Sequence, residues 1–332
     1  MQRSAERLRA YVTGGTGFLG SNIVKVFAER HRATVHCPVH SFVPDNPQGY
    51  TIEPLDLLEA DAVLASVARF NPDVIVHSMI LNDLAGIYAR RELAWHSYVE
   101  TTLTLAEAAN RAGAKLILVS TDWVFDGTQA GADEATPPNP VNYYGVLKTL
   151  SEQAALLRAD RAAVARVSAV NGVHWARAEM PRGQDPGFGY FVATVIDAVS
   201  RGKPFGVWEG SDINMAATPS LASECAEAMW LIAANVQADG IFHCCGAQPA
   251  GRMELARMAC EVFGHDASLL RSVGPDPEVL ASMAGARVPY DTTIRTPRTT
   301  EILGYRPLGA RELLERFKQE IETGGLIAAT GG

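Results

Sequence analysis

The chain has 332 residues, 47% of them hydrophobic, which is enough to bury the core of one large α/β unit or of two cooperating lobes. A net charge of −8 without any basic run argues against nucleic acid as a partner. The sequence lacks an apolar run long enough to span a membrane, an apolar signal region in residues 1–9 and any regular spacing of its five cysteines, so we expect a cytoplasmic protein with reduced thiols and no membrane partner.

The first half of the chain alternates predicted strands with predicted helices. Apolar runs of strand length occupy 9–13, 33–38, 74–78, 116–120 and 163–170. Segments with helical character occupy 21–30, 60–70, 93–112 and 142–158. This order predicts an α/β fold of the doubly wound, Rossmann type, in which helices cover both faces of a parallel sheet.

The composition changes after Asn171, where glycine, proline and tryptophan become more frequent. We therefore predict a first, Rossmann-type domain over 1–170. A smaller, C-terminal substrate-binding lobe is expected over 171–332, with some of its segments returning to the first domain. Helices are predicted in this second half at 220–235, 253–263 and 311–323.

A glycine-rich turn joins the first predicted strand to the first predicted helix. Its spacing is GxxGxxG, formed by Gly14, Gly17 and Gly20. A strand, a glycine turn and a helix in this order aim backbone N–H groups at a diphosphate. The alternative is a tight turn without a ligand. We expect the turn to bind a dinucleotide through Gly14, Thr16, Gly17, Phe18, Leu19 and Gly20.

Tyr144 and Lys148 lie four residues apart on one predicted helix, so their side chains share a face. A nearby ammonium lowers the pKa of a tyrosine, and such a tyrosine can donate a proton to a carbonyl oxygen. Thr121 ends a predicted strand and can offer a hydroxyl group to the same oxygen. We therefore predict Thr121, Tyr144 and Lys148 as catalytic residues, with a surface pair on the helix as the alternative.

Four segments resemble the extended short-chain dehydrogenases/reductases, and among them the dTDP-4-dehydrorhamnose reductases. These segments are 13–20, 120–127, 140–148 and 166–172. The resemblance implies that Tyr144 donates a proton to the C4 keto group of a nucleotide-activated deoxysugar. It also implies that Lys148 holds the nicotinamide ribose, that Thr121 binds the keto oxygen and that the protein forms a homodimer.

The cofactor is expected to contact three further parts of the chain. In the superfamily that the chain resembles, Asp56 and Leu57 occupy the position that contacts the adenine. The residue that reads the ribose is expected about twenty positions after the glycines, at His40 and Ser41. No acidic residue lies in 31–44, which favours NADP(H) over NAD(H).

The substrate is less well defined by the sequence. Trp123, where the family has tyrosine, and Arg287 are the candidates for contacting a nucleoside-diphosphate sugar, the latter at its diphosphate. Tyr98 stands where the superfamily has an asparagine that helps to relay protons, and the segment 82–88 departs from the family's pattern. Two alternatives stay open: reduction of another carbonyl compound in secondary metabolism, and a non-catalytic, nucleotide-binding regulatory subunit. We expect no metal site.

Overall fold

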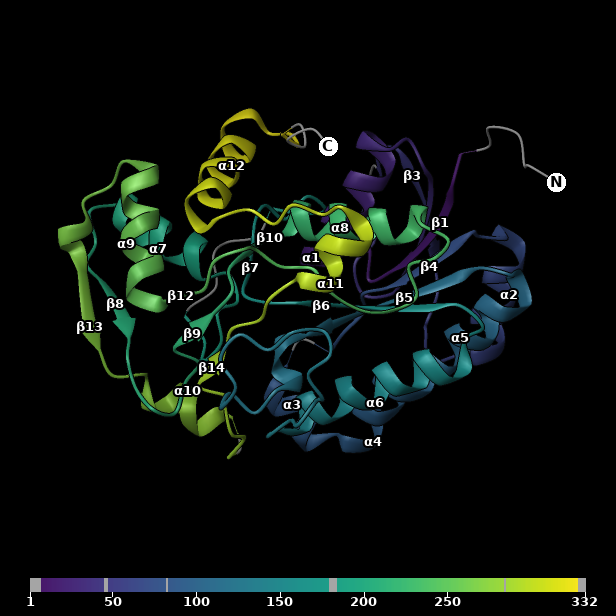
Figure 1. Ribbon diagram of the computed structural model, residues 1–332, viewed down its shortest axis with the longest axis horizontal. Helices are drawn as coiled ribbons and strands as arrows, with labels where there is room; N and C mark the ends of the chain where they lie inside the picture. Colours follow the sequence, from purple (N-terminus) through teal and green to yellow (C-terminus); the bar gives the residue numbers. More distant parts are fainter. Residues whose placement is uncertain (1–6, 45–46, 82, 179–183, 284, 328–332) are drawn as a thin grey trace.

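The computed structural model describes residues 7–44, 47–81, 83–178, 184–283 and 285–327 (Figure 1). A parallel sheet in the order β3-β2-β1-β4-β5-β6-β11 forms its centre. The strands are β1 (Arg9–Thr13), β2 (Thr34–Val39), β3 (Tyr50–Pro54), β4 (Val74–His77), β5 (Lys115–Thr121), β6 (Ala162–Val167) and β11 (Gly240–His243). The predicted doubly wound α/β fold is confirmed. The strand order reverses between β1 and β4, and ligands bind at the carboxyl ends of the strands at such a point.

Helices cover both faces of this sheet (Figure 1). One face carries α1 (Phe18–Lys25) and α8 (Ala222–Ala234). The other carries α2 (Ala60–Phe70), α5 (Thr101–Ala112) and α6 (Tyr143–Arg158). The predicted helix over 93–112 differs in detail, because α4 (Arg91–Trp95) passes into α5 through a π-helical turn, His96–Glu100. Tyr98 lies inside this turn.

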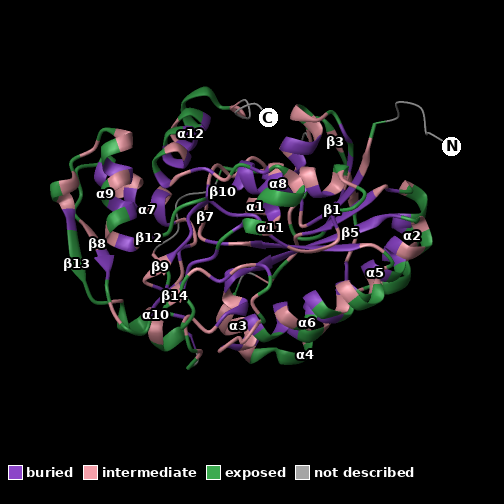
Figure 2. Ribbon diagram, viewed as in Figure 1, coloured by how far each residue is buried: buried purple, intermediate pink, exposed green. Residues whose placement is uncertain are grey.

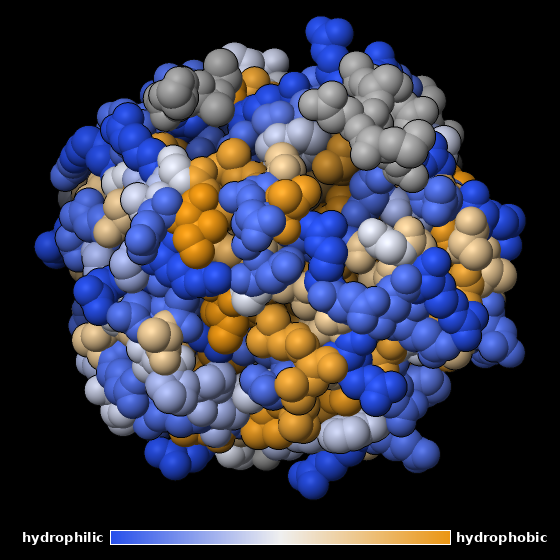
Figure 3. Space-filling view, turned by 45° about the vertical axis from the view of Figure 1, so that its right-hand side comes forward, coloured by the Kyte–Doolittle hydropathy of each residue, from blue (hydrophilic) through white to orange (hydrophobic). Residues whose placement is uncertain are grey.

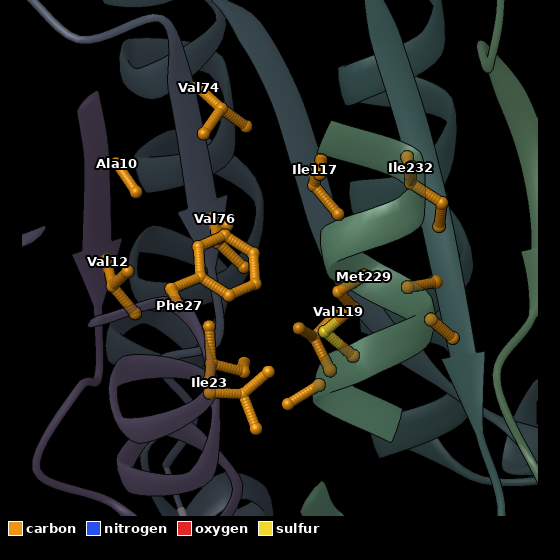
Figure 4. Packing of buried hydrophobic residues seen from close by; sticks show 14 of the residues in the cluster. Ala10, Val12, Ile23, Phe27, Val74, Val76, Ile117, Val119, Met229 and Ile232 are labelled. Atoms are coloured by element: carbon orange, nitrogen blue, oxygen red, sulfur yellow. The ribbon is translucent and has the colours of Figure 1, made fainter. Parts of the chain in front are cut away.

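Each central strand serves two cores, because successive side chains of a strand point to opposite faces of the sheet. Tyr11 of β1 packs with α2 and α5, whereas its neighbours on the strand pack with α1 and α8. Figure 4 shows the second of these cores, in which the two helices meet over the strands. Its labelled side chains are Ala10, Val12, Ile23, Phe27, Val74, Val76, Ile117, Val119, Met229 and Ile232.

The second half of the chain adds a smaller group of elements beside the sheet (Figure 1). Its helices are α7 (Phe191–Ser200), α9 (Arg252–Phe263), α10 (Pro277–Ser282), α11 (Pro297–Leu303) and α12 (Ala310–Thr323). Its paired strands are β8 (Phe205–Trp208) with β13 (Leu270–Val273), β7 (Val170–Asn171) with β10 (Ser220–Leu221), and β9 (Ala216–Ala217) with both β12 (Ala250–Gly251) and β14 (Asp291–Thr292). A hydrophobic core of its own joins α7, α9 and α12.

The predicted strand over 163–170 divides in two. It ends as β6 at Val167, and β7 begins at Val170. Ala169 between them has φ +41°, a left-handed conformation that a side chain disfavours and that no glycine announces in the sequence. The break turns the chain out of the large sheet and into the smaller one, at the carboxyl edge where the two groups of elements meet.

The central strands of the large sheet are buried, whereas the edge strand β3 is partly exposed and the helices expose one side (Figure 2). Hydrophobic side chains also gather on part of the surface (Figure 3). We call the exposed hydrophobic side chains of α4, α5 and α6 the α4–α6 face. It consists of Trp95, Leu103, Val146, Leu150 and Leu157. Among the described helices, none combines the length and the apolar character needed to cross a membrane.

Candidate active site

Two adjoining cavities lie at the carboxyl edge of the large sheet. The glycine-loop cavity, about 540 Å³, is lined by the glycine turn and by the end of β2. The second-lobe cavity, about 550 Å³, is lined by residues that precede α3 (Leu84–Ala89), by the segment 185–189 and by α10. Thr121 and Tyr144 line both cavities, so a molecule in either one reaches the same pair of hydroxyl groups.

The glycine turn is closed so tightly that only glycine fits at its key positions. Gly14 has φ +69°, and its carbonyl accepts a hydrogen bond of 2.9 Å from the N–H of Gly17. A Cβ atom on Gly14 would lie 2.7 Å from the nitrogen of Met79, and one on Gly20 would lie 1.9 Å from the Gly14 oxygen. The start of α1 faces this space. A cradle without side chains at a helix N-terminus fits a dinucleotide diphosphate.

All six predicted residues of the turn line the glycine-loop cavity, as do His40, Ser41 and Leu57. Asp56 does not line it. One carboxylate oxygen of Asp56 accepts a hydrogen bond of 3.0 Å from the N–H of Leu58, and the other lies 3.8 Å from Nε2 of His40. Asp56 therefore borders the cavity through His40 and also holds the turn before α2.

Tyr144 and Lys148 lie in the first turns of α6, and their side chains face the glycine-loop cavity at the carboxyl edge of the sheet. Asn142 positions this helix start, because its Oδ1 accepts a 2.8 Å hydrogen bond from the N–H of Gly145. Nζ of Lys148 donates a hydrogen bond of 2.6 Å to the carbonyl of Val119 in β5. Thr121 lies close enough to Tyr144 to influence the pKa of its hydroxyl group.

The pKa of Tyr144 is raised to about 12, chiefly because burial disfavours the phenolate, while the neighbouring Thr121 side chain opposes this shift. The expected lowering of this pKa by Lys148 is therefore not seen. Burial also lowers the pKa of Lys148 to about 8, against the raising influence of Glu152. Tyr144 thus rests as a protonated phenol, the form that a proton donor requires.

A buried ionic network lies beneath Lys148. Glu152 follows Lys148 by one helical turn and receives two hydrogen bonds from Arg166 of β6, of 2.9 and 2.7 Å. Ser120 donates a third hydrogen bond, of 2.5 Å, to Glu152. The side chains of Glu152 and Arg166 are both 0% exposed. The helix face that carries Tyr144 and Lys148 is therefore anchored to the sheet by a fully buried charge pair.

Asp122 is a further polar residue of the site. Its neighbour Thr121 is predicted from the sequence as a catalytic residue, whereas Asp122 is not. It is buried, lines the second-lobe cavity and accepts hydrogen bonds from Thr121, Ser168 and Thr292, of 3.1, 2.7 and 2.6 Å. Burial raises its pKa to about 6 despite these donors. Its place directly after Thr121 in the matched segment is the signal that could have drawn attention to it.

The two predicted substrate contacts lie in different settings. Trp123 lines the second-lobe cavity, with its ring 6.1 Å from that of Tyr144. Arg287 is exposed and lines neither cavity, although its carbonyl accepts a 2.9 Å hydrogen bond from the side chain of Asn142. Asn82, which begins the segment that departs from the family pattern, lies outside the described residues.

Tyr98 packs against both members of the predicted proton-transfer pair. Its ring is 6.0 Å from the ring of Tyr144, and Nζ of Lys148 lies 5.7 Å from its centroid. Its hydroxyl donates to the carbonyl of Leu81, at 3.2 Å. A bulky ring therefore fills the space beside Lys148. In the described part of the chain, no three His, Cys, Asp or Glu side chains gather as metal ligands.

Comparisons with known proteins agree with this architecture. The chain is 37% identical over 164 residues to methionine adenosyltransferase 2 subunit beta of Xenopus tropicalis, covering 49% of this chain and 47% of that one, so it spans about half the length of this relative. It is 28% identical over 267 residues to a Haloferax volcanii protein named "Probable low-salt glycan biosynthesis reductase Agl14", covering 79% of this chain and 83% of that one.

A similar solved structure is a dTDP-4-dehydrorhamnose reductase from Bacillus anthracis in complex with NADP, with a TM-score of 0.73 and 21% identity over 95% of this chain and 100% of that one. At this identity the likeness concerns the fold. The family model described as "RmlD substrate binding domain" matches residues 8–322, which cover both cavities and the elements that form them. The chain belongs to the RmlD substrate-binding domain family.

Proposed function

We propose that the protein reduces a carbonyl group with a nicotinamide cofactor, preferring NADPH, and that the substrate is the 4-keto group of a nucleotide-activated deoxysugar. The observation that carries this proposal is that Tyr144 and Thr121 line both cavities at once. A cofactor in the glycine-loop cavity and a carbonyl compound in the second-lobe cavity meet at these hydroxyl groups. Family membership and the match to a named reductase over most of its length support the same chemistry.

Bound reduced nicotinamide supplies a hydride to the carbonyl carbon. Tyr144 then donates its phenolic proton to the carbonyl oxygen, and its pKa of about 12 keeps that proton in place until the oxygen gains negative charge. Thr121 orients the phenol and the oxygen through its hydroxyl group. Lys148 holds the nicotinamide ribose and offsets the negative charge that remains on Tyr144 after the transfer.

A conservative variant tests the role of Tyr144. Tyr144→Phe keeps the ring and removes the proton, so we expect kcat to fall by roughly 10²- to 10⁴-fold while the dissociation constant of NADPH changes little. The assay is single-turnover oxidation of NADPH with dTDP-4-keto-6-deoxy sugars. Tyr143→Phe is the matched control, because the hydroxyl of Tyr143 donates to the carbonyl of Arg91 and lines neither cavity. Unchanged turnover in Tyr144→Phe refutes the assignment.

The second candidate is a nucleotide-binding subunit without turnover of its own. The match to a methionine adenosyltransferase subunit over about half of the chain favours it. This candidate predicts tight binding of NADPH without oxidation, and a change in the activity of a methionine adenosyltransferase when the protein is added. Oxidation of NADPH by a ketone outside the sugar nucleotides would instead support reduction of another carbonyl compound.

We further propose that the protein forms a homodimer through the α4–α6 face. Its exposed leucine, valine and tryptophan side chains lie on neighbouring helices, and a partner helix pair would remove them from water. Figure 3 shows several groups of hydrophobic side chains among hydrophilic ones on the face of the molecule that it draws.

A further inference from the structure

We propose that Arg177 binds the 2′-phosphate of NADPH and so selects NADPH over NADH. This inference rests on the proposed function, because it takes the glycine-loop cavity as the dinucleotide site. Arg177 belongs to the segment that follows β7 in the second half of the chain, far in sequence from β2. It nevertheless lines the glycine-loop cavity.

Arg177 lies at the β2 end of the cavity. Its guanidinium carbon is 5.4 Å from the centroid of the Phe42 ring, and Phe42 directly follows His40 and Ser41. In a doubly wound sheet the adenosine ribose lies against the end of the second strand, about twenty residues after the glycine turn. The 2′ position of a bound dinucleotide therefore faces His40, Ser41 and Phe42, where the guanidinium of Arg177 is found.

The positions of the other charged side chains around the cavity favour Arg177 as the group that binds the 2′-phosphate. The lysine and arginine side chains that line the cavity are Lys148 and Arg177. Lys148 lies at the opposite end, where its Nζ donates to the carbonyl of Val119 under the nicotinamide side. Acidic residues are missing from 31–44, and the carboxylate of Asp56 is turned towards His40 and Leu58. Of the two cations that line the cavity among the described residues, Arg177 is therefore the one at the β2 end, where His40 separates the Asp56 carboxylate from the cavity.

The contact with Phe42 also prepares the guanidinium for a phosphate. A planar guanidinium presents parallel N–H donors that match phosphate oxygens, and its bonds to them are charge-assisted. A ring beside the group restricts the planes that the guanidinium can adopt. Arginine is therefore better suited to this position than lysine, whose ammonium group is a compact charge on a flexible side chain without a fixed pair of donors.

Equilibrium binding separates the 2′-phosphate from the rest of the cofactor. We would measure the dissociation constants of NADPH, NADH, 2′,5′-ADP and 5′-AMP by calorimetry for the parent protein and for Arg177→Ala. We expect NADPH and 2′,5′-ADP to bind about 10- to 100-fold more weakly to the variant, and NADH and 5′-AMP to change by less than about twofold. Arg177→Lys should recover part of the loss. Arg257→Ala on the exposed side of α9 is the matched control and should bind all four like the parent.

Three results would overturn the proposal. Equal weakening of NADPH and NADH would mean that Arg177 shapes the cavity without contacting the 2′-phosphate. If Arg177→Ala binds 2′,5′-ADP as tightly as the parent does, Arg177 does not contact the 2′-phosphate. The same conclusion follows if the parent protein binds NADH more tightly than NADPH. Failure of the reductase proposal looks different: selective, Arg177-dependent binding of NADPH without turnover leaves this inference intact, whereas binding of neither dinucleotide rejects both.

Discussion

Replacing Glu152 by glutamine tests whether the buried charge pair beneath Lys148 holds the site together. The substitution keeps the size of the side chain and one acceptor oxygen, so Arg166 and Ser120 still find a partner. What disappears is the negative charge, at a place where both side chains are fully shielded from water. Arg166 is then left as a buried cation without a counter-charge.

The expected loss of stability is large for a single isosteric change. Breaking a fully buried ion pair by removing one charge costs about 3–5 kcal/mol, because the remaining ion stays desolvated. For a chain of this size that corresponds to a fall in melting temperature of roughly 4–7 °C. The surface pair of Glu107 and Arg111, whose side chains are 54% and 64% exposed, provides the comparison. Glu107→Gln should cost less than about 1 kcal/mol.

Urea unfolding followed by circular dichroism measures both variants on one scale. A third variant, which combines Glu152→Gln with Arg166→Met, removes both charges and should regain most of the lost stability, since an apolar replacement for a buried pair is often neutral. If Glu152→Gln unfolds at the same urea concentration as the parent, the pair carries little charge in the folded protein and the reasoning fails.

Two further predictions concern Lys148 and the α4–α6 face. Because the pKa of Lys148 is lowered to about 8, kcat/KM should fall as the pH rises through about 8, and Lys148→Arg should remove that limb; a parent activity that stays constant well beyond this pH contradicts the role of the ammonium. Unfolding does not cause this loss of activity. Between about pH 8 and the ordinary lysine pKa of 10.5, Lys148 binds fewer protons in the folded protein than in the unfolded chain. Its contribution to the free energy of unfolding therefore rises with pH over this range. Leu157 is 77% exposed on the α4–α6 face, and Leu157→Lys should convert a dimer into a monomer in sedimentation, whereas Ile321→Lys on α12 should not; a monomeric parent protein rules out the dimer.

The elements that the sequence predicts well are those whose signals are local. β1 and α2 have the bounds that their apolar patterns indicate, because strand and helix periodicities differ and the flanking residues interrupt them. The glycine turn is equally local, because a backbone position that has no room for a Cβ atom requires glycine. The catalytic roles of Thr121, Tyr144 and Lys148 stay predictions until the variants are measured.

The features that escape the sequence depend on contacts made across long distances. Arg177 reaches the glycine-loop cavity because the segment after β7 packs on α1, where Asn22 donates to the carbonyl of Val173 and Ser21 accepts from the N–H of Trp175. The direction of the Tyr144 pKa shift depends on burial, which includes contacts with the rings of Tyr98 and Trp123 and which the helical spacing to Lys148 does not reveal. Ala169 adopts a left-handed conformation although it is not a glycine, so no residue type marks the end of β6.

The return of β11 and α8 to the large sheet has a consequence for how the chain is made. β11 supplies the last parallel strand beside β6, and α8 covers the same face of the sheet as α1, yet both are translated well after residue 170. A ribosome that has released only the first half leaves the edge of β6 without a partner and the apolar sheet face beside α1 open to water. The nascent chain must therefore wait for its second half, and proteolytic cutting near residue 170 should yield no independently folded fragment.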